Sequence, residues 1–184
     1  MEKVEKEYNQ AEETVSPAPG EFRFRKGERL HHKAFVSRLF ALGKSEYAYP
    51  LRMIYLVESA ALKASAVKSR HVEGSSPEEV LRLMRTDRVQ FMVTVPKKKQ
   101  HKAVDRVLLR RRIREAWRLN RNPLRRLLAS APEPLTLTVA VNYVSSEIKP
   151  YSKIEEKMRK LLDSLSEKVD EAMQTRPKSD DKES

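Results

Sequence analysis

The feature that most constrains this chain is a strongly basic block with the periodicity of an amphipathic helix. Residues 97–126 contain thirteen Lys and Arg and only two acids, a net charge of +11 in thirty positions. Apolar residues recur in the same block at the spacing of one helical face, among them Leu109, Ile113 and Trp117. The block therefore predicts a helix at about 103–120 that lies on the surface of a core, with its apolar side inward and a charged side outward.

Six of the nine arginines of this block fall on one side of the helical wheel, in an arc from about 60° to about 200° when Leu109 is set at zero. Along the helix, Glu115 is the one acid placed to form ion pairs with these arginines, and its possible partners are Arg111 and Arg118. Six arginines against one acid predict a polyanionic partner, because such a charge excess repels itself until phosphate neutralises it. The predicted stripe consists of Arg106, Arg110, Arg111, Arg114, Arg118 and Arg121, and Lys97, Lys98, Lys99 and Lys102 extend it into the preceding loop. The alternative is an ordinary solvated helix face that follows a solubilising strand end.

Charge is distributed unevenly along the 184 residues, whose net charge is +12. Residues 1–20 and 163–184 each carry −3, so the 142 residues between them hold +18. We interpret 1–20 as a disordered acidic leader, 21–173 as a single RNA-binding domain and 174–184 as a disordered charged tail. The chain has no Cys, which excludes disulfides and thiolate metal sites, and it shows neither a membrane span nor an apolar signal segment. A cytoplasmic location is expected.

Hydrophobic periodicity predicts an α/β fold, an α+β sandwich with the order α-β-β-α-β-α around a small mixed sheet. A first helix ends at Gly43, and a strand covers 51–57 after a turn-like region at Lys44 and Ser45. Residues 58–88 are interpreted as a long connection with two helical turns. Strands are predicted at 89–95 and 135–143, a short extra turn at 124–129, and a last helix after Pro150.

Catalytic side chains are not evident in the sequence. His31, His32, His71 and His101 are scattered without carboxylates at ligand spacing, so no metal site is predicted on the protein. The chain also lacks a Gly-rich phosphate loop, a nucleophile motif and an acidic cluster for two Mg²⁺ ions. We expect a protein that binds RNA and breaks no bond by itself.

Several short motifs follow one another in a distinctive order. They are Arg29-Leu30, Gly43-Lys44-Ser45, Pro50-Leu51-Arg52, Val95-Pro96-Lys97-Lys98 and, above all, the run from Lys102 to Ala116. Together they resemble the protein subunit of bacterial ribonuclease P over about residues 22–168. The resemblance implies a small cytoplasmic protein, one per catalytic RNA, that helps this RNA remove the 5′ leader of precursor tRNA. It also implies that the RNA performs the chemistry and holds the Mg²⁺, and that the fold contains a left-handed β-α-β crossover.

The resemblance assigns roles to individual residues. Phe40, Tyr55 and Tyr151 would line a cleft for the single-stranded leader, where aromatic rings stack on unpaired bases. RNA phosphates would meet Lys97, Lys98, Arg106, Arg110, Arg111 and Arg114, and the stripe itself adds Lys99, Lys102 and Arg118.

One departure from the family pattern lies inside the basic helix. The family carries Arg-Asn-Arg where this chain has Arg106-Val107-Leu108, and Val107 falls inside the arginine arc. We hypothesise that Arg110, Arg111 and Arg112 compensate, and that Val107 contacts a sugar or lies under an arginine stem.

Two other functions fit the same sequence features. One is a general RNA-binding or ribosome-associated protein of the same fold without ribonuclease P activity, consistent with the altered motif. The other is a basic amphipathic helix that binds a membrane surface or a protein partner, which leaves the flanking strands without a role.

Overall fold

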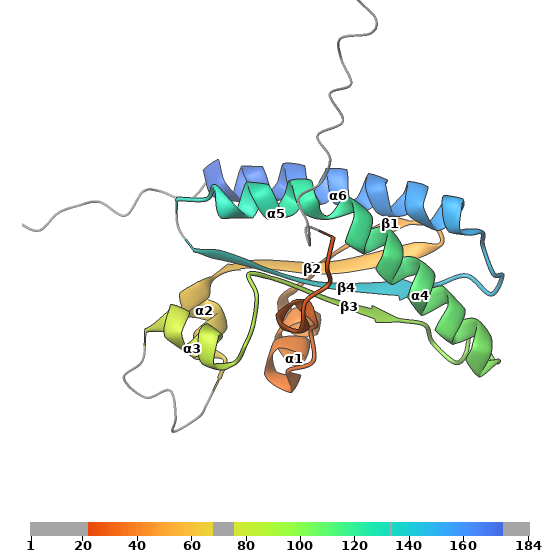
Figure 1. Cartoon of the computed structure of the whole chain (residues 1–184), viewed down its shortest axis with the longest axis horizontal. Coiled ribbons are helices and arrows are strands. Elements are labelled where there is room, and N and C mark those ends of the chain that lie inside the picture. The colour runs from red at the N-terminus through yellow and green to blue at the C-terminus, as the bar shows by residue number, and fades with distance from the viewer. Residues whose placement is uncertain (1–21, 68–75, 133, 175–184) are drawn as a thin grey trace, which may run out of the picture.

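A four-stranded mixed sheet with the strand order β1-β2-β4-β3 organises the protein. In the computed structural model, residues 22–67, 76–132 and 134–174 are described (Figure 1). β1 (Lys44–Ala48) runs antiparallel to β2 (Leu51–Ser59), β2 runs antiparallel to β4 (Leu135–Tyr143), and β3 (Val89–Thr94) runs parallel to β4. The predicted α/β fold around a small mixed sheet is confirmed.

Helices connect and cover these strands. They are α1 (Lys33–Leu42), α2 (Ala60–Ser65), α3 (Pro77–Leu83), α4 (Ala103–Asn120), α5 (Asn122–Ala129) and α6 (Tyr151–Gln174), with a short 3-10 turn η1 (Lys26–Glu28) before α1. The helix before Gly43, the basic helix and the last helix are confirmed, and the extra turn near 124–129 is the two-turn helix α5. In the region interpreted as a connection, β2 extends to Ser59 and two helices follow. No helix of the described ranges is long and apolar enough to cross a membrane.

The predicted leader lies outside the described residues, as does the predicted tail apart from Gln174, which ends α6. The sequence analysis predicts a turn-like region at Lys44 and Ser45, and this interpretation is wrong because β1 begins there. β1 is a short edge strand whose residues are largely exposed, so its sequence carries no apolar alternation. Pairing with β2 creates the strand, from Ala48 opposite Leu51 to Lys44 opposite Tyr55.

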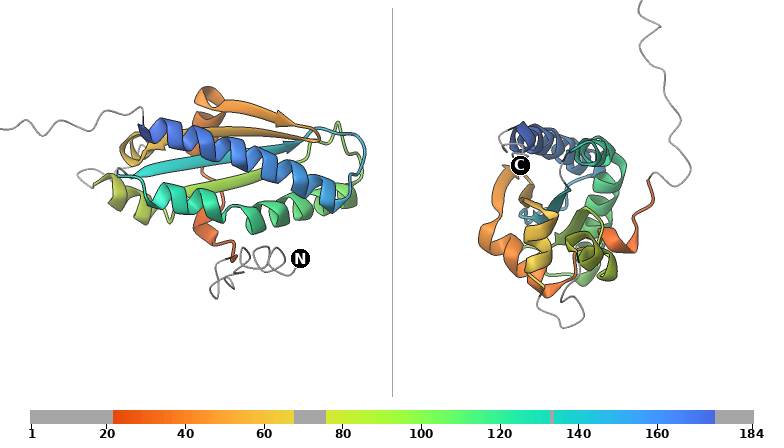
Figure 2. Two further views of the ribbon diagram at one scale, coloured as in Figure 1. Left: turned by 90° about the horizontal axis from the view of Figure 1, so that it is seen from above. Right: turned by 90° about the vertical axis from the view of Figure 1, so that its left-hand side faces the viewer.

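The two faces of the sheet carry different helices (Figure 1). α4, α5 and α6 pack on one face over a core that contains Phe91, Val139 and Trp117. The view from above in Figure 2 shows α6 and the α4–α5 pair extended along the sheet. α1 packs on the opposite face against Ile54 and Ala140, where α2 and α3 also contribute. Both faces of the central strands are therefore covered over most of their length, with Arg52 of β2 left exposed.

A crossover through α4 and α5 joins the parallel neighbours β3 and β4. It leaves the end of β3 through the loop that carries Lys97 to Lys99 and places α4 beside this edge strand of the sheet. The topology thus brings the basic loop and the basic helix together. The left-handed sense of the crossover remains an implication of the family resemblance.

A buried polar cluster anchors α1 and α2 to the sheet. Arg38 Nε lies 2.6 Å from Glu58 Oε2, and Lys63 Nζ donates to Thr138 Oγ1 at 3.0 Å. Lys63 is fully buried, with its Nζ 5.1 Å from the centroid of the Phe35 ring. Burial lowers the pKa of Lys63 to about 8, while the nearby carboxylate of Glu58 acts in the opposite direction. One polar network thus sets how α1 sits on the sheet.

Lys63 gives the stability of the protein a definite pH dependence. Between pH 8 and 10.5 the folded protein loses this proton while the unfolded chain keeps it, so the free energy of unfolding rises with pH. We expect Lys63→Met to lack this contribution. The free energy of unfolding of the wild type should therefore rise by about 3 kcal/mol relative to that of the variant between pH 8 and 10.5. Urea unfolding of both proteins at several pH values measures the difference. A difference that does not change with pH would contradict the depressed pKa.

Candidate nucleic-acid interface

Helix α4 is held against the sheet by its apolar side. Leu109, Ile113 and Trp117 are fully buried. The Trp117 indole stacks on the Phe91 ring of β3, with centroids 4.4 Å apart and an angle of 11° between the planes. α4 lies at the outside of the molecule (Figure 1). Because these contacts occupy one side of the helix, side chains on its other side are left to face solvent.

Two arginines of α4 bind loops of the protein itself. Arg106 Nη1 donates to the carbonyl oxygens of Gln100 and His101, at 2.9 and 2.6 Å. Arg112 Nη1 donates to the carbonyl oxygen of Lys149 at 2.7 Å. These guanidinium groups fasten the loops before α4 and before α6, so Arg106 already has partners within the protein.

Arg118 is also engaged. Its Nε and Nη2 donate to the two carboxylate oxygens of Glu115 at 2.9 and 2.6 Å, and its Nη1 donates to the carbonyl oxygen of Phe22 at 3.1 Å. The hydrogen bond from Arg118 lowers the pKa of Glu115. The sequence analysis offers Arg111 and Arg118 as partners of Glu115, and in the structure Arg118 forms the ion pair.

Arg121 does not belong to the outward stripe in which the sequence analysis places it. It is fully buried, with Nη2 3.0 Å from Glu28 Oε2, and Arg125 approaches the other Glu28 oxygen at 3.1 Å. Arg121 also donates to the carbonyl oxygens of Arg23 and Arg118. Burial lowers the pKa of Arg121, and Glu28 opposes this shift. The helical wheel misses the pair because Glu28 is 93 residues away in sequence.

The remaining predicted side chains form the basic surface. None of them has a hydrogen bond or ion pair from its side chain to another described residue. All are exposed except Arg110, which is half-buried. The basic surface comprises Lys97, Lys98 and Lys99 after β3, Lys102 before α4, and Arg110, Arg111 and Arg114 on α4. These cations are thus available to an anion from outside.

A small hollow adjoins one end of the basic surface. It measures about 280 Å³ and lies at the edge of β3, between α4 and the segment before α1. Arg114 and Arg29 both line it, together with Phe24, Met92 and Val93. Arg29 is a candidate contact that the charge pattern missed, since it lies outside the basic block at 97–126 and only the short bridge from Arg29 to β3 brings it there.

The structure does not bring the three predicted leader-cleft aromatics together. Tyr55 is buried under α6, where Lys168 Nζ lies 5.9 Å from its ring centroid, and burial raises the pKa of its phenol. Phe40 is exposed on α1, on the opposite face of the sheet. Tyr151 begins α6, and its half-buried ring packs against the core beneath α4 and α6. The prediction that all three side chains line a single cleft is therefore wrong.

A different row of side chains crosses the open part of the sheet on the α1 side. Strand register aligns Tyr47 with Arg52, Arg52 with Asn142, and Asn142 with Thr94, one residue from each strand. Tyr47 and Arg52 are exposed, and Thr94 Oγ1 donates to Asn142 Oδ1. We call these four residues the sheet row. Sequence reasoning missed the row because only the register places its members side by side, although Asn142 does interrupt an apolar strand.

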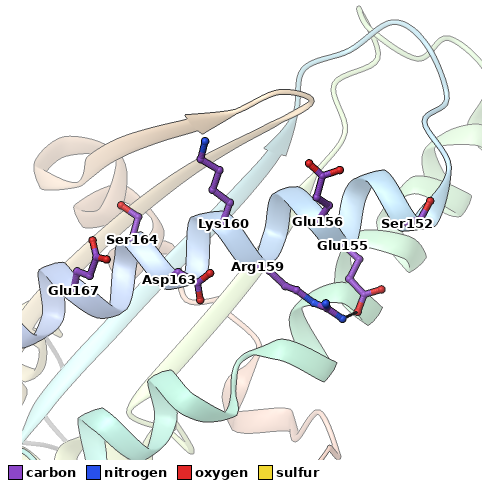
Figure 3. Close-up of a pocket in the computed structure, with 8 residues that line it drawn as sticks. All are labelled: Ser152, Glu155, Glu156, Arg159, Lys160, Asp163, Ser164 and Glu167. Carbon is purple, nitrogen blue, oxygen red and sulfur yellow. Dashed lines mark hydrogen bonds and ion pairs between the residues drawn. The ribbon is translucent and has the colours of Figure 1, made fainter. Parts of the chain in front are cut away.

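A second, larger hollow lies elsewhere and has the opposite character. It measures about 710 Å³, and all the residues that line it belong to α6 (Figure 3). Acidic side chains outnumber basic ones there by four to two, and the four are Glu155, Glu156, Asp163 and Glu167. One of the two basic residues, Arg159, forms an ion pair with Glu155 at 2.9 Å. This acidic helix face would repel phosphate, so an RNA is expected to approach the basic surface instead.

Metal-binding side chains do not assemble in the described ranges, where no three acidic or histidine side chains converge as a metal site would require. His71 lies outside those ranges.

A family model described as Ribonuclease P matches residues 22–166, which is well over half of the chain and includes the basic surface and the sheet row. The chain belongs to the ribonuclease P protein family. The prediction made from the motifs is thereby confirmed, and this family places the chain in tRNA processing as the protein component of ribonuclease P.

Two relatives in particular agree with the family match. Two proteins from strains of Porphyromonas gingivalis, each named Ribonuclease P protein component, are 28% and 30% identical over 145 residues. Each alignment covers 79% of this chain and 88% of the relative. The solved structure of the Staphylococcus aureus RNase P protein matches 76% of this chain and 96% of its own, with 15% identity and a TM-score of 0.47.

The buried pair of Glu28 and Arg121 should be structural in this ribonuclease P protein. We expect Glu28→Gln to lower the free energy of unfolding by about 3 kcal/mol, because it leaves a buried guanidinium without its carboxylate. Arg111→Gln removes an exposed cation without such a partner and should leave unfolding unchanged. Urea denaturation of the two variants makes the comparison, and equal stabilities would show that the pair contributes nothing.

Proposed function

We propose that the basic surface binds the catalytic RNA of ribonuclease P. The observation that supports this most is that seven cationic side chains, from two adjoining elements, have no acidic partner among the described residues. Phosphate oxygens are the natural acceptors for such groups, and arginine binds them with two parallel hydrogen bonds. In this proposal the basic surface neutralises the RNA backbone, while the arginines that bind acceptors within the protein keep α4 in place.

The chemistry, in this proposal, belongs to the RNA. As the family resemblance implies, the RNA holds the Mg²⁺ ions and cleaves the 5′ leader from precursor tRNA, with one protein per RNA in the cytoplasm. The protein side chains then supply binding energy and position. The near absence of acids around the basic surface fits this division, because the close approach of RNA requires cations there.

The sheet row is our proposed contact for the single-stranded leader. Arg52 offers a cation for a phosphate, and the exposed Tyr47 offers a ring on which a base can stack. Asn142 adds amide groups that can hydrogen-bond a base edge. Phe40 stays a candidate at the edge of this face, whereas Tyr55 is too deeply buried to meet RNA in this conformation.

Reconstitution tests the proposal. The protein, mixed with a bacterial ribonuclease P RNA and precursor tRNA at low Mg²⁺, should restore cleavage. We expect Arg110→Gln/Arg111→Gln/Arg114→Gln to weaken RNA binding on the order of 100-fold at low salt and to lower the slope of log Kd against log salt by about three. Filter binding over a salt series gives both quantities.

A charge-matched control separates location from net charge. Lys153→Gln/Arg159→Gln/Lys160→Gln removes three cations from α6, so it should leave RNA affinity close to that of the wild type. Similar losses in both triple variants would mean that overall charge, not the basic surface, carries binding. RNA binding without any gain in cleavage would favour a general RNA-binding protein of this fold.

A further inference from the structure

Three exposed apolar side chains interrupt the polar side of α4. Val104 is 76% exposed, Val107 is 38% exposed and Leu108 is 36% exposed. Their spacing of three and four residues places them next to one another over the first two turns of the helix. We call them the apolar patch.

The core of the protein does not explain the apolar patch. With Leu109 set at zero on the helical wheel, the patch spans about 160° to 260°, whereas Leu109, Ile113, Ala116 and Trp117 all lie within about 80° of zero. Those four residues are fully buried. The patch therefore points away from the sheet, and exposed apolar clusters of this kind usually mark a contact with another molecule.

The charges around the apolar patch indicate which molecule. Arg111 follows at the centre of the patch one turn later, exposed and without an ion pair among the described residues. Asp105 is the one acid in the first two turns of α4. A partner with apolar surface and negative charge complements this combination, and an unpaired nucleotide has both, in the face of its base and in its phosphate.

We infer that the apolar patch packs against the face of an unpaired nucleobase in the RNA partner, while Arg111 binds a neighbouring phosphate. This inference rests on the proposed RNA-binding function and specifies what the first turns of α4 recognise. Val107 accordingly contacts RNA directly and is not covered by an arginine stem.

Such a contact has a distinct signature. Phosphate contacts release counterions and weaken steeply with salt, whereas apolar packing on a base does not. Because an unpaired base exposes its face and a duplex hides it by stacking, the patch should discriminate between single-stranded and double-stranded RNA.

The test replaces the patch by polar residues of similar size, in Val104→Thr/Val107→Thr/Leu108→Gln. We expect the affinity for a bacterial ribonuclease P RNA to fall roughly tenfold with no change in the salt slope. A single-stranded RNA decamer should lose affinity in the same way, while a blunt duplex of the same sequence should not. The matched control is Leu62→Gln, which replaces another exposed leucine, 49% accessible, in α2. It should change neither the affinity for the ribonuclease P RNA nor that for the single-stranded decamer.

Each other outcome overturns the inference. An unchanged affinity shows that the patch does not touch RNA, and an equal loss for the duplex shows that no base face is recognised. If the wild type self-associates in sedimentation and the patch variant does not, the patch contacts a second copy of the chain instead. The arginine triple variant keeps the two proposals separate. If it loses RNA binding while the patch variant does not, the inference about the patch fails and the proposed function stands.

Discussion

The stacking of Trp117 on Phe91 is the contact on which the rest of the structure depends. It fixes the rotation of α4 about its own axis, and that rotation decides which side chains face solvent. The parallel pairing of β3 with β4 then determines where the helix begins and keeps the lysine loop beside it. A helix with the same sequence but a different rotation would bury its cations or expose its core, at a cost of several kcal/mol either way.

Arginine serves two purposes in this protein, and partners within the described part of the chain separate them. A guanidinium that leaves water needs acceptors, and Arg121 finds them in Glu28 and in carbonyl oxygens. Arg106 and Arg112 bind carbonyl oxygens at loop ends, where they act as fasteners. The cations that stay in water keep their full ability to bind phosphate, so the proposed RNA contact falls to the basic surface of α4 and its preceding loop.

Strand parity explains the failure of the predicted aromatic cleft. Tyr55 and Ile54 are neighbours in β2, yet one faces α6 and the other faces α1. Since helices cover both faces, residues 51–57 are apolar nearly throughout, and the sequence contains no contrast that would assign a face. Regions with a single buried side were easier to predict, because α4 and α6 show the helical period of one apolar stripe.

The sequence by itself determined the amphipathic basic helix, the order of most elements and the family, because these depend on local periodicity and on motifs read along the chain. Only the tertiary structure decided which arginines remain available, that Tyr47, Arg52, Asn142 and Thr94 share a row, and that Val104, Val107 and Leu108 stay exposed. The physical reason is that ion pairing, strand register and burial join residues far apart in sequence. Glu28 and Arg121, 93 positions apart, are the clearest instance.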